Sequence, residues 1–244
     1  MNEKVRVMIP CRMASTRLPN KPLADIGGKP MIIHVAEKAT AARVGQVTVA
    51  CDSQQIFDVV KKYGYDAVMT DPALPSGSDR IWQGVQRLMQ AGEERPDIII
   101  NVQGDEPLLP PELVRACLPP FWHDWVDVVT FAHPIHAEAE KMNPSMVKAV
   151  TDEKHRALYF SRSPIPYGGE VLKRHIGIYA YRYGALERFV LAEPSPLERQ
   201  EKLEQLRGLE LGLNYYVGMT DAAPIGVDTP EDLERVRKMV IAAS

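Results

Sequence analysis

Four basic side chains lie close together in a segment that follows the first apolar run of the chain. They are Arg12, Arg17, Lys21 and Lys29. Guanidinium and ammonium groups, with hydroxyls such as that of Ser15, suit the oxygens of phosphate groups. Pro19 and Pro22 restrict the segment and reduce the entropy lost when it is ordered around a ligand. Composition leaves two interpretations open, a phosphate site or a solvated surface loop, and the Walker-type phosphate loop pattern is absent.

Two aspartates could hold a metal ion. Asp105 follows the apolar run at 98–102, where a carboxylate is poorly hydrated unless it meets a cation or hydrogen-bond donors. Asp228 is expected between a short strand and the start of a helix. Mg²⁺ typically takes one or two protein carboxylates together with substrate phosphates, so convergence of these side chains would make a magnesium site. A turn at Asp105 and a helix cap at Asp228 are the simpler interpretations, and convergence cannot be seen in the sequence.

The segment "PSGSDR" at 75–80 could also face a ligand. Gly77 lets a ligand approach the backbone closely, and Ser78 and Asp79 could bond a base. The simpler interpretation is that Ser78 caps the helix that follows.

The second half of the chain contributes a separate group of candidates. Arg162, Arg174 and His175 lie near aromatic residues, and Glu204 and Gln205 are expected within a helix over 197–212. A histidine on a half-apolar strand is more often structural than catalytic, and charged side chains on such a helix usually face solvent. The histidines show no metal-ligand spacing, so we do not expect a zinc site.

Alternating strand and helix patterns would position these residues. Strand-like runs are expected at 5–10, 46–52, 66–70 and 97–102, with helical patterns between them at 30–44, 53–64 and 78–92. This order indicates an α/β fold with a mostly parallel sheet and helices on both faces. Ligands bind beyond the carboxyl ends of the strands in such sheets. The polar residues described above follow those strand ends, which favours a binding site there.

The pattern changes from about Val126. Strands are expected at 126–132, 145–152, 175–182 and 214–219, with proline-bearing stretches between them and one long helix over 197–212. A last helix is predicted with Thr229 as N-cap, Pro230 at its first position and Asp232 as the partner in a capping box. A single domain over 1–244, in which residues from approximately 126 to 220 form a second lobe, is the simplest organisation.

The composition limits the classes of protein. The 244 residues carry a net charge of −3, which argues against a basic surface made for nucleic acid. Cys11, Cys51 and Cys117 are odd in number and far apart, so we expect buried thiols in a reducing compartment and no disulfides. No apolar window approaches 18 residues and no signal peptide is recognised, so we expect a cytoplasmic protein without a membrane partner.

Several segments, in this order, together resemble one family. They are "IPCRMASTRLPNKPLADIGGKPMI", "SGSDR", "NVQGDEPLL", "ALYFSR", "RHIGIYAY", "PSPLERQEKLEQLR" and "GVDTPEDLERV". The chain is similar, over nearly its whole length, to the 3-deoxy-manno-octulosonate cytidylyltransferases. The resemblance implies a GT-A-like nucleotidyltransferase sandwich whose smaller lobe makes a homodimer. It implies transfer of CMP from CTP to the anomeric hydroxyl of the sugar acid (Kdo), with Mg²⁺ and with release of pyrophosphate, for lipopolysaccharide biosynthesis.

The resemblance also implies roles for individual residues. Triphosphate binding is implied for Arg12, Ser15, Arg17 and Lys21. The cytosine and ribose loop is implied at Ser76, Gly77 and Arg80. Metal binding is implied for Asp105 and Asp228, which with Arg12 and Lys21 are the predicted catalytic residues. The sugar-acid pocket is implied at Gln103, Arg162, His175, Tyr179, Glu204 and Gln205. Of these, Arg162 and His175 are expected to accept the sugar carboxylate.

The chain also departs from the family pattern. Cys11 stands where the family usually has alanine, a change between small side chains, and the serine of "SGSDR" replaces a more usual threonine. The stretch 161–182 is shorter than in many members and lies near the sugar site of the family. The 8-amino analogue of Kdo, or another acidic sugar, is therefore an alternative substrate. A GT-A glycosyltransferase, which should carry a D-x-D motif, and a nucleotide-binding regulator without turnover are more distant alternatives.

Overall fold

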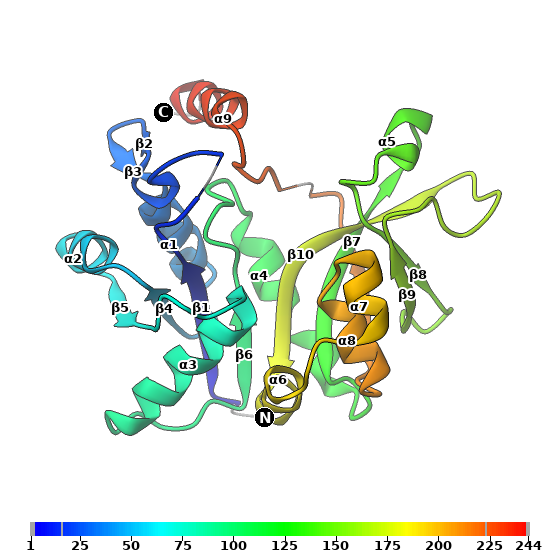
Figure 1. Ribbon diagram of the computed structural model, residues 1–244, viewed down its shortest axis with the longest axis horizontal. Coiled ribbons are helices and arrows are strands. Elements are labelled where there is room, and N and C mark those ends of the chain that lie inside the picture. The colour runs from blue at the N-terminus through cyan, green and yellow to red at the C-terminus, as the bar shows by residue number, and fades with distance from the viewer. Residues whose placement is uncertain (1–2, 16, 223, 243–244) are drawn as a thin grey trace. The chain divides into compact units, whose positions relative to one another are not determined.

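The structure is a computed structural model, and it describes residues 3–15, 17–222 and 224–242 (Figure 1). The chain divides into two compact units, one made of Met1–Arg115 with Pro224–Ser244 and the other of Ala116–Ala223. The first unit is therefore discontinuous in sequence. The lobe predicted at approximately 126–220 lies within the second unit, and its part in sugar binding and dimerisation stays a prediction.

A parallel sheet forms the centre of the first unit. Its strands follow the order β6 (Ile98–Asn101), β1 (Val5–Cys11), β4 (Gln46–Cys51) and β5 (Asp66–Met69). All four residues of β6 are buried, as expected of a parallel strand that is covered on both faces. The carboxyl ends of β1, β4 and β6 therefore meet at one edge, which is where the polar segments predicted to bind ligands begin.

Three helices connect these strands, α1 (Met31–Ala41), α2 (Gln54–Lys62) and α3 (Gly77–Gln90). The chain moves outward from β1 to β4 to β5 and then returns to β6. Because such crossovers are right-handed, α1 and α2 cover one face of the sheet and α3 covers the other (Figure 1). The predicted α/β class, with a mostly parallel sheet and helices on both faces, is confirmed.

Two helix starts differ from the sequence prediction. Ser76 is the N-cap of α3, and its hydroxyl oxygen accepts a hydrogen bond from the backbone N–H of Asp79 at 3.1 Å. Ser78, the predicted cap, is buried inside the first turn. Pro30 is the N-cap of α1 and does not belong to its first turn. Ser76 and Ser78 are both good N-cap residues, and spacing alone does not separate them.

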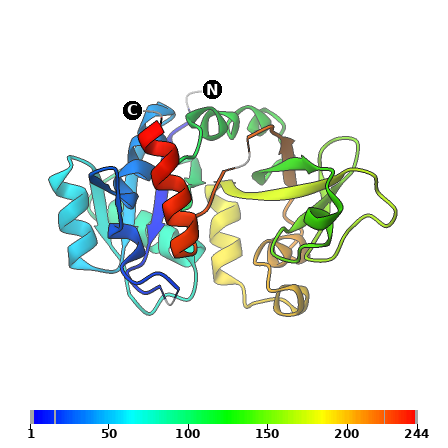
Figure 2. The same ribbon diagram turned by 90° about the horizontal axis from the view of Figure 1, so that it is seen from above.

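The last helix of the first unit, α9 (Pro230–Ala242), packs beside the short hairpin of β2 (Asp25–Ile26) and β3 (Lys29–Pro30), as Figure 2 shows. The Thr229 hydroxyl oxygen accepts a hydrogen bond from the N–H of Asp232 at 3.2 Å, and the Asp232 carboxylate accepts one from the N–H of Thr229 at 3.0 Å. The predicted capping box is confirmed. No strand precedes it in residues 224–228, so the strand expected before Asp228 was a wrong prediction.

The second unit contains a mixed sheet. β7 (Val128–Ile135) pairs in parallel with β11 (Tyr215–Met219) and antiparallel with β10 (Leu172–Arg182). β8 (Lys148–Thr151) pairs antiparallel with β9 (Ala157–Ser161) and meets β10 at Arg174. Besides α7 and α8, which are described below, the described parts of the chain also contain η1 (Lys21–Leu23), α4 (Pro111–Ala116), η2 (Pro119–Trp122), α5 (Glu138–Met142) and α6 (Tyr183–Leu191).

The long helix predicted over 197–212 is two short helices, α7 (Pro196–Glu201) and α8 (Gln205–Glu210). Lys202 between them has φ 56° and ψ 48°, a left-handed conformation that ends α7. The break lets the guanidinium of Arg207 bind the carboxylate of Glu198 through two hydrogen bonds of 2.6 and 2.7 Å. In a straight helix, residues nine apart would lie about 13.5 Å apart along the axis, too far for this pair.

Candidate functional site

The two predicted metal-binding aspartates of the first unit converge on one lysine. The ammonium nitrogen of Lys21 lies 2.7 Å from Oδ2 of Asp105 and 3.0 Å from Oδ1 of Asp228. These two oxygens are therefore at most 5.7 Å apart, the sum of the two distances. The Lys21 side chain is only 15% exposed, whereas Asp105 and Asp228 are 34% and 51% exposed. The lysine thus lies beneath two carboxylates that remain open to solvent.

Backbone contacts bring the two aspartates together. The N–H of Val227 donates a hydrogen bond to the carbonyl of Asp105 at 2.9 Å, which ties the segment before α9 to the segment after β6. Gly104 lies so close to β1 that a Cβ atom there would be 2.6 Å from the carbonyl oxygen of Pro10. Glycine is therefore needed for Asp105 to lie beside the carboxyl end of β1. The N–H of Asp228 donates to the carboxylate of Asp232 at 3.1 Å, so the capping box also fixes this residue.

The residues present fit a magnesium ion. Asp105 and Asp228 provide two partly exposed carboxylates within one site, and Mg²⁺ commonly uses one or two carboxylates and completes its octahedron with phosphate oxygens and water. Within the described parts of the chain, no group of three or more histidine, cysteine, aspartate or glutamate side chains is arranged to hold a metal. Metal binding by these two aspartates stays a prediction.

The basic segment surrounds the same site. Arg17 lies 3.2 Å from the carboxylate of Asp228 and is 64% exposed, so its guanidinium can be offered to a ligand. Arg12 is also exposed. The hydroxyl of Ser15 is turned toward its own segment, where it accepts a hydrogen bond from the N–H of Leu18 at 3.4 Å. Arg17 and Lys21 therefore contact the carboxylates of the site, whereas the side chain of Arg12 is exposed to solvent.

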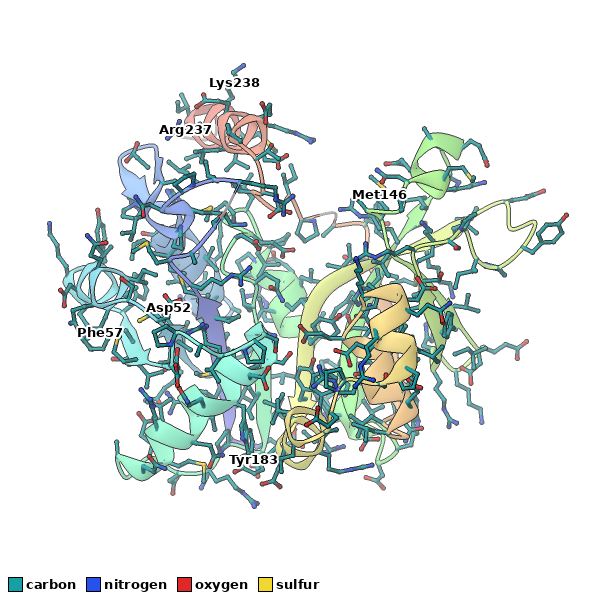
Figure 3. The ribbon with its side chains drawn as sticks, viewed as in Figure 1. Asp52, Phe57, Met146, Tyr183, Arg237 and Lys238 are labelled. Carbon is teal, nitrogen blue, oxygen red and sulfur yellow. The ribbon has the colours of Figure 1, made fainter. Side chains whose placement is uncertain are left out.

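Arg80 supports this segment from beneath. Its guanidinium is 3% exposed, donates to the Thr70 hydroxyl at 2.6 Å, and lies 3.7 Å from the carboxylate of Asp52. Asp52, which is labelled in Figure 3, in turn accepts a hydrogen bond from the N–H of Met13 at 2.8 Å. Arg80 and Asp52 therefore hold the start of the basic segment. Ser76 and Gly77 lie at the start of α3 as described above, and their contact with a nucleotide stays a prediction.

Asp52 was not among the predicted site residues. It follows β4 directly, at the same sheet edge as the basic segment and Asp105, and that position was the available signal. Its partner is a backbone N–H 39 residues earlier, which no sequence pattern identifies.

Three of the predicted sugar-site residues lie together in the second unit. The ring of His175 lies 5.4 Å from that of Tyr179 and 5.0 Å from that of Phe160, measured between centroids. Burial raises the pKa of Tyr179 well above its usual value, and the nearby Glu204 carboxylate raises it further. Burial also lowers the pKa of His175 to about 3, so the imidazole is neutral near pH 7. The cluster therefore combines aromatic rings with the carboxylate of Glu204.

Arg162 is held by main-chain oxygens. Its guanidinium donates to the carbonyls of Glu201 at 2.8 Å, Pro144 at 3.0 Å and Lys202 at 3.2 Å. The backbone N–H of Arg162 donates to the Glu201 carboxylate at 3.0 Å. Arg162 therefore fixes the break between α7 and α8, just before Glu204 at the N-cap of α8. Capture of a sugar carboxylate by Arg162 would compete with these contacts.

Lys148 completes this support. Its side chain is fully buried, and its ammonium group donates to the carbonyls of Asn143 at 3.0 Å, Met146 at 2.7 Å and Arg162 at 2.6 Å. Met146 is labelled in Figure 3. All three N–H donors of the lysine are used, so burial costs less than it would for an unpaired cation. Desolvation lowers the pKa of Lys148, and the nearby Arg162 acts in the same direction.

The other predicted sugar-site residues differ in position. Gln205 is buried in the first turn of α8. Gln103 belongs to the first unit, where it follows β6. Near α8, the hydroxyl of Tyr215 is buried, and a Cβ atom on Gly208 would lie 2.0 Å from it. Gly208 therefore has to be glycine for this tyrosine to fit.

Comparison with known proteins identifies the family. The family model described as Cytidylyltransferase matches residues 6–218. The chain is 50% identical to the 3-deoxy-manno-octulosonate cytidylyltransferase of Brucella anthropi, covering 97% of this chain and 96% of the relative. It is 51% identical to the enzyme of that name from Bradyrhizobium diazoefficiens, with 97% of each chain covered.

A solved structure agrees with this assignment. The structure of CMP:2-keto-3-deoxy-manno-octonic acid synthetase complexed with CTP superposes with a TM-score of 0.91 at 41% identity, covering 99% of this chain and 100% of that chain. The similarity thus extends over both units and includes the segments that carry Lys21, Asp105 and Asp228. The chain belongs to the 3-deoxy-manno-octulosonate cytidylyltransferase family of nucleotidyltransferases.

Proposed function

We propose that the protein transfers CMP from CTP to the anomeric hydroxyl of 3-deoxy-D-manno-octulosonate, releasing pyrophosphate, as a step of lipopolysaccharide biosynthesis. The observation that carries the proposal is the convergence of Lys21 with Asp105 and Asp228, in a chain that is about half identical to enzymes named for this reaction. Two carboxylates and a set of cations at one sheet edge suit a metal-bound nucleoside triphosphate.

The reaction exchanges one bond at phosphorus for another. The oxygen of the anomeric hydroxyl forms a bond to the α-phosphorus of CTP and gives its proton to solvent, and the bond from the α-phosphorus to the leaving pyrophosphate breaks. Such transfers depend mainly on alignment and on neutralising charge. Arg12, Arg17 and Lys21 would bind the phosphates, and Lys21 would offset charge that develops on the leaving pyrophosphate.

Asp105 and Asp228 would hold Mg²⁺, which when bound neutralises phosphate oxygens and acidifies a coordinated hydroxyl. The chain's own part is to hold these carboxylates in place through the Val227 hydrogen bond and the capping box. Asp52 and Arg80 would keep the basic segment in position while the triphosphate binds.

We infer that the parent sugar acid is the substrate, and not its 8-amino analogue, because the quoted relatives carry the name of the parent sugar. His175, Tyr179 and Glu204 would contribute to its pocket. A homodimer and a cytoplasmic location belong to the same proposal. The three free, buried cysteines agree with a reducing compartment. None of the helices in the described parts of the chain is long and apolar enough to cross a membrane.

A pyrophosphate-release assay with CTP and Mg²⁺ tests the proposal. The purified protein is given a panel of acidic sugars that includes the parent sugar, its 8-amino analogue and a nonulosonate. We expect the highest kcat/KM with the parent sugar. Faster turnover of another member of the panel would replace the proposed substrate, and no turnover of any member would reject the proposed reaction. Size-exclusion chromatography with light scattering measures the oligomeric state.

A further inference from the structure

The strand that carries His175 and Tyr179 is irregular between these two residues, after Ile176 and before Ala180. β10 pairs with β7 at Ile176 opposite Phe131 and again at Ala180 opposite Val129. Between these pairs β7 has one residue, Thr130, whereas β10 has the three residues 177–179. Bulges of this kind redirect side chains and are common beside active sites. His175 is still paired opposite Ala132, so the bulge sets the direction in which Tyr179 projects relative to His175.

Thr130 closes the bulge from the opposite strand. Its side chain is completely buried. The hydroxyl oxygen lies 2.8 Å from the carbonyl of Ile178, 3.1 Å from the carbonyl of Ile176 and 2.8 Å from Nε2 of His175. One hydroxyl thus connects the looped-out backbone of β10 to the histidine side chain.

Counting hydrogens assigns the donors in this contact. A threonine hydroxyl has one hydrogen and can accept bonds through its lone pairs, whereas a carbonyl oxygen can only accept. The hydroxyl hydrogen is directed to the main-chain carbonyls, so the bond to His175 requires the hydrogen on Nε2. In a neutral imidazole the other nitrogen, Nδ1, is then an acceptor. Within the described parts of the chain Nδ1 has no hydrogen-bond partner.

The surroundings of the ring favour the neutral form. Its aromatic neighbours are Phe160, which meets it edge-on at an interplanar angle of 69°, and Tyr179. The titratable groups near this cluster include the phenols of Tyr179 and Tyr215 and the carboxylate of Glu204, with Arg207, Asp127 and Glu198 acting on Tyr215. Burial lowers the pKa of His175 to about 3, so a positive charge is not available at neutral pH to attract a carboxylate.

We propose that Thr130 is a positioning residue that fixes His175 as the neutral Nε2–H tautomer and leaves Nδ1 to accept a hydrogen bond from a hydroxyl group of the bound sugar acid. The proposal rests on the proposed function and deepens it. It assigns His175 to a hydroxyl of the substrate, and not to the carboxylate that the sequence resemblance implied for it. An unprotonated Nδ1 would repel a carboxylate and favour a hydroxyl hydrogen.

The tautomer can be measured without any substrate. Protein labelled with ¹⁵N-histidine is studied by long-range ¹H–¹⁵N correlation at pH 7, where protonated and unprotonated ring nitrogens resonate far apart. Comparison with His175→Asn assigns the signals of His175 among the six histidines. We expect hydrogen on Nε2 and none on Nδ1. Hydrogen on Nδ1, or on both nitrogens, overturns the proposal whether or not the proposed reaction is correct.

Kinetics then tests the link to the sugar. Thr130→Ser keeps the hydroxyl, whereas Thr130→Val removes it at nearly constant volume. We expect Thr130→Val to lose the fixed tautomer and to raise KM for the sugar acid about tenfold, the effect of one hydrogen bond, with KM for CTP within about twofold. Thr130→Ser should keep both the tautomer and the wild-type KM, and Thr151→Val serves as the control for losing a threonine hydroxyl elsewhere in the unit.

Two outcomes would contradict the role of Thr130. One is a folded Thr130→Val protein with unchanged tautomer and unchanged KM for the sugar acid. The other is an equal rise of KM for both substrates, which a merely structural residue would give. If Thr130→Val does not fold, the wild-type tautomer still decides, because hydrogen on Nδ1 overturns the proposal. A protein with the expected tautomer but no cytidylyltransferase activity would overturn the proposed function and, with it, the sugar contact.

Discussion

The ammonium group of Lys21 lies 2.7 Å from a carboxylate oxygen of Asp105, so a residue predicted to bind phosphate neutralises a residue predicted to bind a metal. The same ammonium also contacts Asp228 at 3.0 Å. If a magnesium–triphosphate complex binds here, the pairs have to be exchanged. The carboxylates would turn to the metal and the lysine to the phosphates. Each charged side chain would then still face a group of opposite charge.

Lys21→Met should have opposite effects on turnover and on metal binding. Loss of a cation near the leaving group should lower kcat about 10²–10³-fold, as for other electrostatic stabilisers. At the same time two carboxylates lose their partner, so Mn²⁺ should bind more tightly in the absence of nucleotide, as measured by electron paramagnetic resonance. Lys29→Met removes a neighbouring lysine that pairs with Glu37 and should change neither quantity. Mn²⁺ affinity that falls in Lys21→Met would contradict this account.

Asp228→Asn should leave less than a tenth of the wild-type rate of CMP-sugar formation at saturating Mg²⁺. The amide removes the charge that a metal needs while it keeps the shape of the side chain. Asp66→Asn changes an exposed aspartate in a surface ion pair and is the matched control. Circular dichroism checks that both variants fold. A rate above a tenth of wild type would show that Asp228 does not hold an essential metal.

Asp52→Leu should weaken CTP binding indirectly, through the position of the basic segment. The N–H of Met13 and the guanidinium of Arg80 would lose their acceptor, and a buried unpaired donor costs about 1–3 kcal/mol. We expect KM for CTP to rise and KM for the sugar acid to stay constant. Asp52→Asn, which keeps one acceptor oxygen, should show a smaller rise. An equal change in both KM values would mean that Asp52 supports the whole unit and not the basic segment.

The pair of Glu198 and Arg207 should be the most sensitive ion pair of the second unit. Both side chains are nearly buried, with 11% and 8% exposed. Removing one partner of such a pair costs about 3–5 kcal/mol. Glu198→Gln should therefore lower the melting temperature by about 6–20 °C, at about 2–4 °C per kcal/mol for a chain of this size. Glu234→Gln, in an exposed pair with Arg237, should shift it by less than about 2 °C.

His175 should make the free energy of unfolding depend on pH below about 6.5. Its pKa in the folded protein is about 3, whereas an unfolded histidine titrates near 6.5. Between these values the unfolded state binds one more proton, so stability falls as pH falls, by up to about 1.4 kcal/mol per pH unit. Urea unfolding between pH 4 and 7 measures this slope. His175→Gln should show a shallower slope, and identical slopes would contradict a histidine that is neutral in the folded protein.

The elements that were predicted from sequence are those with a strong local pattern. The buried run of β6 and the capping box of Thr229 and Asp232 depend on neighbours in the chain, and both were identified. The break at Lys202 was not, because it is required by the contact of Glu198 with Arg207 across two helices. The helical spacing of apolar residues does not show where tertiary contacts hold a residue in a left-handed conformation and so end a helix.

The candidate site, too, was only partly predictable from the sequence. The residue types at the strand ends indicated a phosphate and metal site, but Asp105 and Asp228 lie 123 positions apart, and only the folded chain shows that both reach Lys21. Asp52 was missed because its role depends on a backbone N–H of a distant segment. The proposed role of Thr130 in positioning His175 depends on a bulge in β10. The alternation of apolar and polar residues does not reveal this bulge.

The hydrogen bond from Val227 to Asp105 also has a consequence for how the protein is made. During synthesis, the ribosome completes residues 116–223 before it adds the segment that carries Asp228. A nascent chain can therefore build the parallel sheet and the basic segment while one of the two carboxylates is still missing. The candidate site is complete only when the segment with Val227 and Asp228 joins the segment with Asp105, so we expect activity to appear only after this late segment has been made.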